Sequence, residues 1–153
     1  PRSKKLGSRV LSNLEKLYLT IKRLSLKIED GSEYFNNAHE AGIPIKNLKK
    51  LQNNLFGLEA NFEELSAIDF KKGCYIGQEV TARMKHKARL KNKLYCGHIP
   101  TNPENKVDKK IYFNGKIVGE IYSICNNYCL IKIKEDFKEE ELTVFGQPLT
   151  LLD

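Results

Sequence analysis

The stretch that decides the fold has the sequence Lys110-Ile111-Tyr112-Phe113-Asn114-Gly115-Lys116-Ile117-Val118-Gly119-Glu120-Ile121-Tyr122. Two runs rich in β-branched and aromatic residues flank the pair Asn114-Gly115. Asn-Gly is the preferred pair for a type I′ turn, because both central positions of that turn need a positive φ angle. The stretch therefore predicts a β-hairpin with strands over residues 110–113 and 116–122.

Further strands are predicted on both sides of this hairpin. From Lys91 onward the sequence period becomes two, as in Leu94, Cys96 and His98. A second turn at Asn126-Asn127 leads into a run over residues 128–133, and residues 142–152 supply one or two more strands. Several short antiparallel strands at this spacing predict a small β-barrel.

The part of the chain before the barrel carries helical patterns. Apolar residues recur at helical spacing between Leu11 and Tyr18, and Gly42-Ile43-Pro44 stops a second helical segment. Good helix formers predict a further helix from Tyr75 to about Lys85, with one apolar stripe formed by Ile76, Val80 and Met84. The predicted class is α+β, with an α/β region over residues 1–88 and a β-barrel over residues 89–153.

Composition limits the classes of partner and compartment. Twenty-six lysines and arginines against nineteen acids give a net charge of +7, which favours anionic partners. No run of about 18 apolar residues is present, so membrane insertion is not expected. Because the chain begins at Pro1 and not at a methionine, we expect a piece of a longer protein.

Cysteine usage points to a reducing compartment. The four cysteines lack the regular spacing of a disulfide framework, so the cytosol or an organelle matrix is expected. They are Cys74, Cys96, Cys125 and Cys129. A metal site is not predicted, because Cys125 and Cys129 form a doublet without a second one.

One stretch goes beyond what folding requires, namely Lys71-Lys72-Gly73-Cys74-Tyr75-Ile76-Gly77-Gln78-Glu79. At a predicted helix start, free backbone N–H groups and the two lysines would favour the thiolate form of Cys74. Such a thiol suits redox, persulfide or metal-handling chemistry. The alternative is a small buried apolar residue, since free cysteine is among the most buried residue types.

With Phe70 before it and Arg83 after it, this stretch resembles the Lys-Gly-Cys-Tyr-x-Gly-Gln-Glu signature of the YgfZ family of folate-binding proteins. These are relatives of the aminomethyltransferase, or T protein, of the glycine cleavage system. The resemblance extends to four other elements, Leu6-Gly7-x-Arg9, Gly42-Ile43-Pro44, Leu58-Glu59-Ala60-Asn61 and Val118-Gly119-Glu120-Ile121. The chain resembles the C-terminal half of a family member.

The resemblance implies a T-protein-like fold, in which ferredoxin-like α/β lobes surround a folate site and a β-barrel closes the structure. It implies tetrahydrofolate as a ligand, and support of the maturation or repair of iron–sulfur enzymes, including enzymes that modify tRNA. The implied partners are iron–sulfur assembly proteins or client enzymes, and the expected state is a monomer. Cys74 would be the reactive residue.

Five residues are candidate folate contacts. Glu59 is the expected pterin anchor, because a carboxylate can accept two N–H bonds from an aminopyrimidine edge. Lys72 suits an anion such as the glutamate tail of a folate, and Tyr75, Gln78 and Arg83 complete the set. Each has a structural alternative, as a surface charge, a core aromatic or a helix-terminal residue.

Two other functions stay open. The first is folate-dependent aminomethyl transfer, as in the T protein. The second is RNA binding through a basic run, which consists of Arg83, Lys85, His86, Lys87, Arg89, Lys91 and Lys93. Contacts of that run with phosphates would weaken steeply with salt. The run lacks interleaved aromatic residues for base stacking, so a solvated basic face is the simpler interpretation.

Overall fold

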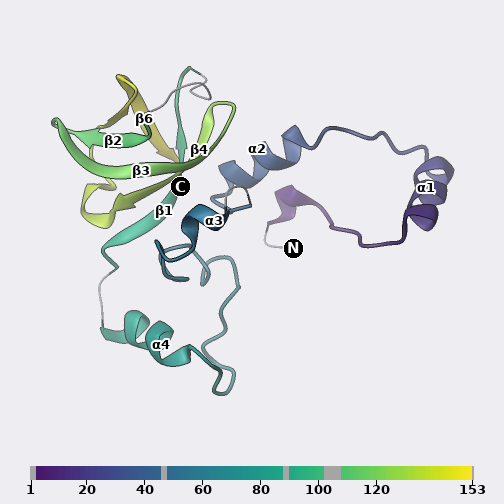
Figure 1. The fold of residues 1–153 in the computed structure, drawn as a ribbon, viewed down its shortest axis with the longest axis horizontal. Helices are drawn as coiled ribbons and strands as arrows, with labels where there is room; N and C mark the ends of the chain where they lie inside the picture. The colour runs from purple at the N-terminus through teal and green to yellow at the C-terminus, as the bar shows by residue number, and fades with distance from the viewer. Residues whose placement is uncertain (1–2, 46–47, 88–89, 102–107, 153) are drawn as a thin grey trace.

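The fold of the chain is known from a computed structural model, which describes residues 3–45, 48–87, 90–101 and 108–152 (Figure 1). Its C-terminal part is a closed barrel of six strands in the order β1-β4-β3-β2-β5-β6. The strands are β1 (Asn92–His98), β2 (Lys110–Phe113), β3 (Lys116–Cys125), β4 (Tyr128–Lys134), β5 (Leu142–Val144) and β6 (Gln147–Leu152). Every neighbouring pair is antiparallel, which confirms the predicted small β-barrel.

The turns of the barrel follow the local sequence signals. Asn114 and Gly115 have φ angles of 47° and 75°, as the predicted hairpin requires. Asn126, at the turn between β3 and β4, has a φ angle of 52°. Strand β3 continues three residues beyond the predicted end at Tyr122, to Cys125. Its extra residues pair with the start of β4, where Cys125 lies opposite Tyr128.

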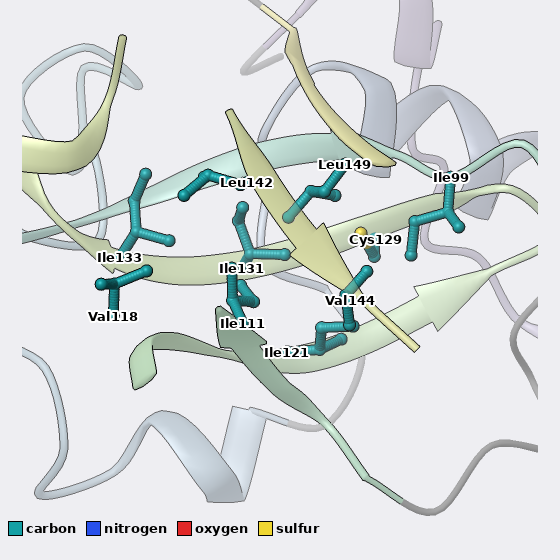
Figure 2. Close-up of a cluster of buried hydrophobic side chains, with 10 residues drawn as sticks. All are labelled: Ile99, Ile111, Val118, Ile121, Cys129, Ile131, Ile133, Leu142, Val144 and Leu149. Carbon is teal, nitrogen blue, oxygen red and sulfur yellow. The ribbon is translucent and has the colours of Figure 1, made fainter. Parts of the chain in front are cut away.

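The interior of the barrel is filled by one cluster of apolar side chains (Figure 2). Strand β4 shows how alternation builds it, because Ile131 and Ile133 are fully buried while Lys132 between them points outward. The cluster consists of Ile99, Ile111, Val118, Ile121, Cys129, Ile131, Ile133, Leu142, Val144 and Leu149.

Two glycines allow the strands to approach closely. A Cβ atom added to Gly119 would lie 2.3 Å from the backbone oxygen of Lys132 on β4. A Cβ atom added to Gly97 would lie 2.7 Å from Cδ1 of Leu149. Gly119 needs a residue without a side chain because the atom it would meet is backbone, whereas at Gly97 the Leu149 side chain would have to shift.

The remaining elements are helices and turns. They are η1 (Lys4–Leu6), α1 (Leu14–Arg23), α2 (Ser32–Glu40), α3 (Leu48–Leu51), α4 (Gln78–Lys87) and, between β4 and β5, η2 (Glu135–Phe137). Among the described residues before Asn92 there is no strand, so the expected T-protein-like α/β lobe is not confirmed. The α+β class rests on the barrel and these helices. The predicted boundary between residues 88 and 89 lies outside the described residues.

Helix α2 is attached to the barrel by a buried histidine. His39 is 1% exposed, with Nδ1 2.8 Å from the carbonyl oxygen of Phe35 and Nε2 2.8 Å from Oγ of Ser123 on β3. A carbonyl oxygen can only accept a hydrogen bond, so Nδ1 is assigned the proton and Nε2 accepts from the Ser123 hydroxyl. This links a helix to a strand 84 residues away.

A second apolar cluster lies apart from the barrel interior. Leu94, Tyr122 and Leu130 come from three neighbouring strands and are covered by Leu51 and Leu55. The segment around α3 therefore packs against the barrel through this cluster.

Helix α1, unlike α2, has no buried residue. Figure 1 shows it held away from the barrel on two extended stretches of chain. Its first turn is capped by Asn13, whose Oδ1 accepts the N–H of Lys16 at 2.9 Å. Neither α1 nor any other helix within the described ranges has the length and apolar character that crossing a bilayer demands.

Candidate functional site

The signature forms a turn that precedes a helix. Helix α4 begins at Gln78, three residues later than predicted, because Gly77 has a left-handed φ angle of 89°. The N–H of Gln78 donates to the carbonyl oxygen of Tyr75 at 3.1 Å, and the N–H of Tyr75 donates to Oε1 of Gln78 at 3.2 Å. Gln78 therefore stabilises the turn through its own side chain.

Cys74 is the exposed thiol of the chain. The other three cysteines are buried in the barrel. Burial raises the pKa of both Cys96 and Cys129 to about 12, so these two thiols stay protonated at neutral pH. The predicted position of Cys74 at a helix N-terminus is wrong, because three residues separate it from Gln78, the first residue of α4. Its accessibility, and not a helix dipole, distinguishes it.

Three of the predicted contact residues lie together beside Cys74. The ammonium nitrogen of Lys72 stands 5.2 Å from the centroid of the Tyr75 ring, in cation–π geometry. The hydroxyl oxygen of Tyr75 is buried and has no hydrogen-bond partner among the described residues. With the Tyr75–Gln78 bonds, this makes a compact unit of Lys72, Tyr75 and Gln78.

The predicted apolar stripe of this helix is wrong. Ile76 lies before α4 and is fully exposed, and Val80 is exposed as well. Because the helix begins two residues after Ile76, the i, i+4, i+8 spacing does not place the three residues on one helical face. Helix α4 is instead held by Phe70, whose ring makes an edge contact with His86 at a centroid distance of 6.5 Å.

Much of the basic run is neutralised within the chain. Lys85 pairs with Glu63 at 2.5 Å and Lys93 pairs with Glu64 at 2.7 Å. Arg83 pairs with Glu79, one helical turn earlier, at 2.6 Å. Arg89 lies outside the described residues, and the side chain of Lys87 is not described. The partners of the two lysines lie 22 and 29 residues earlier, which local charge patterning does not reveal.

Glu59, the expected pterin anchor, is engaged in the fold. It is 7% exposed, and its Oε2 accepts the N–H of Phe56 at 3.0 Å. Its backbone oxygen accepts the N–H of Leu94 at 2.8 Å, and Nδ2 of Asn61 donates to the carbonyl oxygen of Leu94 at 2.8 Å. Residues 58–61 thus cover the edge of β1 next to its pairing with β6. The expected role of Glu59 as a pterin anchor stays a prediction.

Two hollows lie near the junction of the helical part and the barrel. One, of about 300 Å³, is lined among others by Glu40, Asn61, Glu64, Lys93 and Lys138. The other, of about 320 Å³, is apolar and is lined among others by Leu51, Leu55, Phe56 and Phe62. No residue of the signature lines either hollow. Cys74 is exposed at the surface, outside both of them. Within the described ranges no group of three His, Cys, Asp or Glu residues could hold a metal ion.

Comparison with known proteins finds relatives of two kinds. The iron–sulfur cluster assembly factor IBA57 homolog of Dictyostelium discoideum, a mitochondrial protein by name, is 36% identical over 98 residues. That match covers 62% of this chain and 24% of the relative. The IBA57 homolog of Neurospora crassa is 33% identical over 94 residues, covering 61% of this chain and 21% of the relative.

The second kind carries the name tRNA-modifying protein YgfZ. The protein from Buchnera aphidicola is 31% identical over 121 residues, which cover 71% of this chain and 37% of the relative. The matched part of the chain thus spans about a quarter of the length of the IBA57 relatives and somewhat more of this YgfZ relative. No family model matches the chain.

Proposed function

Because the chain belongs to the family of IBA57 and YgfZ, we propose that it is an accessory protein of iron–sulfur enzyme maturation or repair, with Cys74 as its reactive group. An influence on tRNA modification would then be indirect, through iron–sulfur enzymes that modify tRNA. The names of the two groups of relatives support this role, since one is an iron–sulfur cluster assembly factor and the other a tRNA-modifying protein.

The observation that carries the proposal is the exposure of the signature. Cys74 and both preceding lysines are exposed, and Lys71, Lys72 and Cys74 have no place in either apolar cluster. The fold does not need these side chains, so another requirement accounts for their presence. An exposed thiol that follows a pair of lysines suits exchange with a macromolecular partner better than chemistry on a small substrate, which needs an enclosed pocket.

Tetrahydrofolate enters the proposal through the family resemblance. Lys72, Tyr75 and Gln78 are the residues that would contact it, with the Lys72 ammonium facing the glutamate tail. Arg83 is paired with Glu79, and Glu59 is engaged at the edge of β1, so neither is free for the ligand in this structure.

The two IBA57 relatives carry the word mitochondrial in their names. We propose an organelle matrix or the cytosol as the compartment of this chain.

Complementation tests the proposed role of Cys74. The full chain is expressed in cells depleted of their own IBA57 or YgfZ protein, and the activity of a [4Fe–4S] enzyme is measured. The chain is expected to restore that activity, and the Cys74→Ala variant is expected to lose it while keeping the far-UV circular dichroism of the parent. Cys125→Ala, which removes a buried thiol, serves as the control. Full restoration by Cys74→Ala would refute the role of this thiol.

Ligand binding is tested separately by titrating the purified chain with tetrahydrofolate in a calorimeter. Heat of binding that is reduced by Lys72→Ala but not by Lys116→Ala, an exposed lysine at the β2–β3 turn, is the expected result. Absence of binding would remove folate from the proposal and leave the iron–sulfur role to the complementation result.

A further inference from the structure

Helix α1 is the tip of an arm with two fixed ends. The N-terminal end is held near α2 by the ion pair of Lys5 with Glu40 at 2.8 Å and by Arg9, which donates to the Tyr34 hydroxyl at 2.7 Å. Gly31, with a φ angle of 83°, is the residue that caps the start of α2 at the other end. Between these ends the chain runs outward to α1 and back (Figure 1). The arm therefore presents α1 away from the body.

One side of α1 is an apolar stripe that the described part of the chain leaves uncovered. Its residues are Leu14, Leu17, Tyr18 and Ile21, at positions i, i+3, i+4 and i+7, followed by the capping residue Leu24. Leu14 is 82% exposed, Tyr18 61% and Leu17 38%, and Ile21 is half-buried. Large apolar surfaces of this kind mark sites where another molecule binds.

The charges beside the stripe indicate what that molecule is. Glu15 and Lys22 are seven residues apart, so successive steps of 100° bring them to the same flank of the stripe. When two such helices pack antiparallel about a two-fold axis near Tyr18 and Leu19, Glu15 lies opposite the partner's Lys22. The same axis places Lys22 opposite the partner's Glu15. A stripe with opposite charges at its two ends is thus complementary to itself.

We propose that the stripe on α1 binds a second copy of this chain, as an antiparallel α1–α1 pair related by two-fold symmetry. The monomer expected from the sequence would then exist only at low protein concentration. The pairing is independent of the proposed iron–sulfur role, because α1 shares no residue with the signature or with the barrel.

The first experiment measures mass in solution. The purified full chain is followed by sedimentation equilibrium over a range of concentrations, and the expected mass at high concentration is twice 17.6 kDa. Leu17→Glu, in the middle of the stripe, is expected to raise the dimer dissociation constant by at least about tenfold, because it places a charge in an apolar contact. Leu19→Glu is the matched control, since it makes the same change on the opposite side of the same helix and is expected to leave dimerisation intact.

The second experiment exchanges the two charges. Glu15→Lys and Lys22→Glu each bring like charges together twice in the symmetric pair, and each is expected to weaken dimerisation by roughly fivefold. The double variant restores both ion pairs with their ends reversed and is expected to recover most of the affinity. Circular dichroism confirms that all variants keep the parental fold.

Two results would overturn the proposal. A mass of one chain at all concentrations would show that the stripe does not bind a second copy and is the surface for a different molecule. Dimers that survive Leu17→Glu, or that the double charge exchange fails to restore, would place the dimer contact elsewhere.

Discussion

At the scale of single residues, the charged side chain of Glu59 is almost completely buried. Its carboxylate accepts a hydrogen bond from the backbone N–H of Phe56. Glu59→Ala removes this hydrogen bond to a charged group. We therefore expect Glu59→Ala to lower the free energy of unfolding by about 1–3 kcal/mol, measured by urea denaturation.

Glu64→Ala is the matched control for that measurement. It removes the same charge from an exposed side chain that pairs with Lys93, and it should change the free energy of unfolding by less than about 1 kcal/mol. If Glu59→Ala were as stable as the parent chain but lost tetrahydrofolate binding, Glu59 would be a ligand contact and not a structural residue.

Residue roles were the least predictable part of the chain. The role of Glu59 depends on contacts with Leu94 and Asn92, more than thirty residues away, so sequence spacing could not reveal it. Exposure of Cys74 was one of two interpretations that the sequence left open. Its predicted place at a helix start failed because the left-handed φ angle of Gly77 delays the helix.

At the scale of elements, the approach of β3 to β4 depends on Gly119. A Cβ atom there would meet the Lys132 carbonyl oxygen at 2.3 Å and Cγ2 of Ile133 at 2.6 Å. Since the first of these is backbone, the strands themselves would have to move apart. We expect Gly119→Ala to lower the free energy of unfolding by about 3 kcal/mol or more, measured by chemical denaturation.

Gly73→Ala provides the comparison. It makes the same substitution in the signature turn, where an added Cβ meets nothing within 4 Å. A change of less than about 0.5 kcal/mol is expected there. Equal effects of the two substitutions would contradict the close approach of β3 and β4.

Elements with local signals were predicted well. The Asn114-Gly115 turn is fixed by the φ angles of its own two residues, and the apolar run that forms β4 lies within seven consecutive residues. The cover formed by Leu51 and Leu55 on Leu94, Tyr122 and Leu130 joins three strands with a distant segment. No local pattern encodes such a contact.

At the scale of the whole molecule, the buried thiols couple stability to alkaline pH. The pKa of Cys96 and of Cys129 rises from 9.0 to about 12 on folding. Between these values the folded chain binds more protons than the unfolded chain, so raising the pH favours unfolding. The stability contribution is complete below about pH 9 and is lost progressively toward pH 12.

Denaturation with urea at pH 7, 9, 10 and 11 measures this loss. The midpoint is expected to fall as the pH rises above about 9, with a smaller fall in Cys129→Ala, which has one buried thiol fewer. A midpoint that stays constant up to pH 11 would contradict the burial of these thiols.

The arrangement of the whole molecule was predicted for one part only. The barrel follows from hairpins between neighbouring strands, which the sequence shows one turn at a time. An α/β lobe was expected before it, and the described residues there form helices and turns. Packing of those helices depends on buried contacts such as that of His39 with Ser123, which join residues 84 positions apart.

The turn that carries Cys74 is held by hydrogen bonds among its own neighbours, Asp69 with Lys71 and Tyr75 with Gln78, and contributes no side chain to the barrel interior. The exposed side chains of Lys72 and Cys74 are therefore under little selection for folding. Selection acts on mutations in the barrel first because they lower stability. Selection acts on mutations at Lys72 or Cys74 mainly through their effect on the function of the turn. Variation between natural homologues at these positions would thus report on chemistry alone, without the background that conservation of a protein core usually adds.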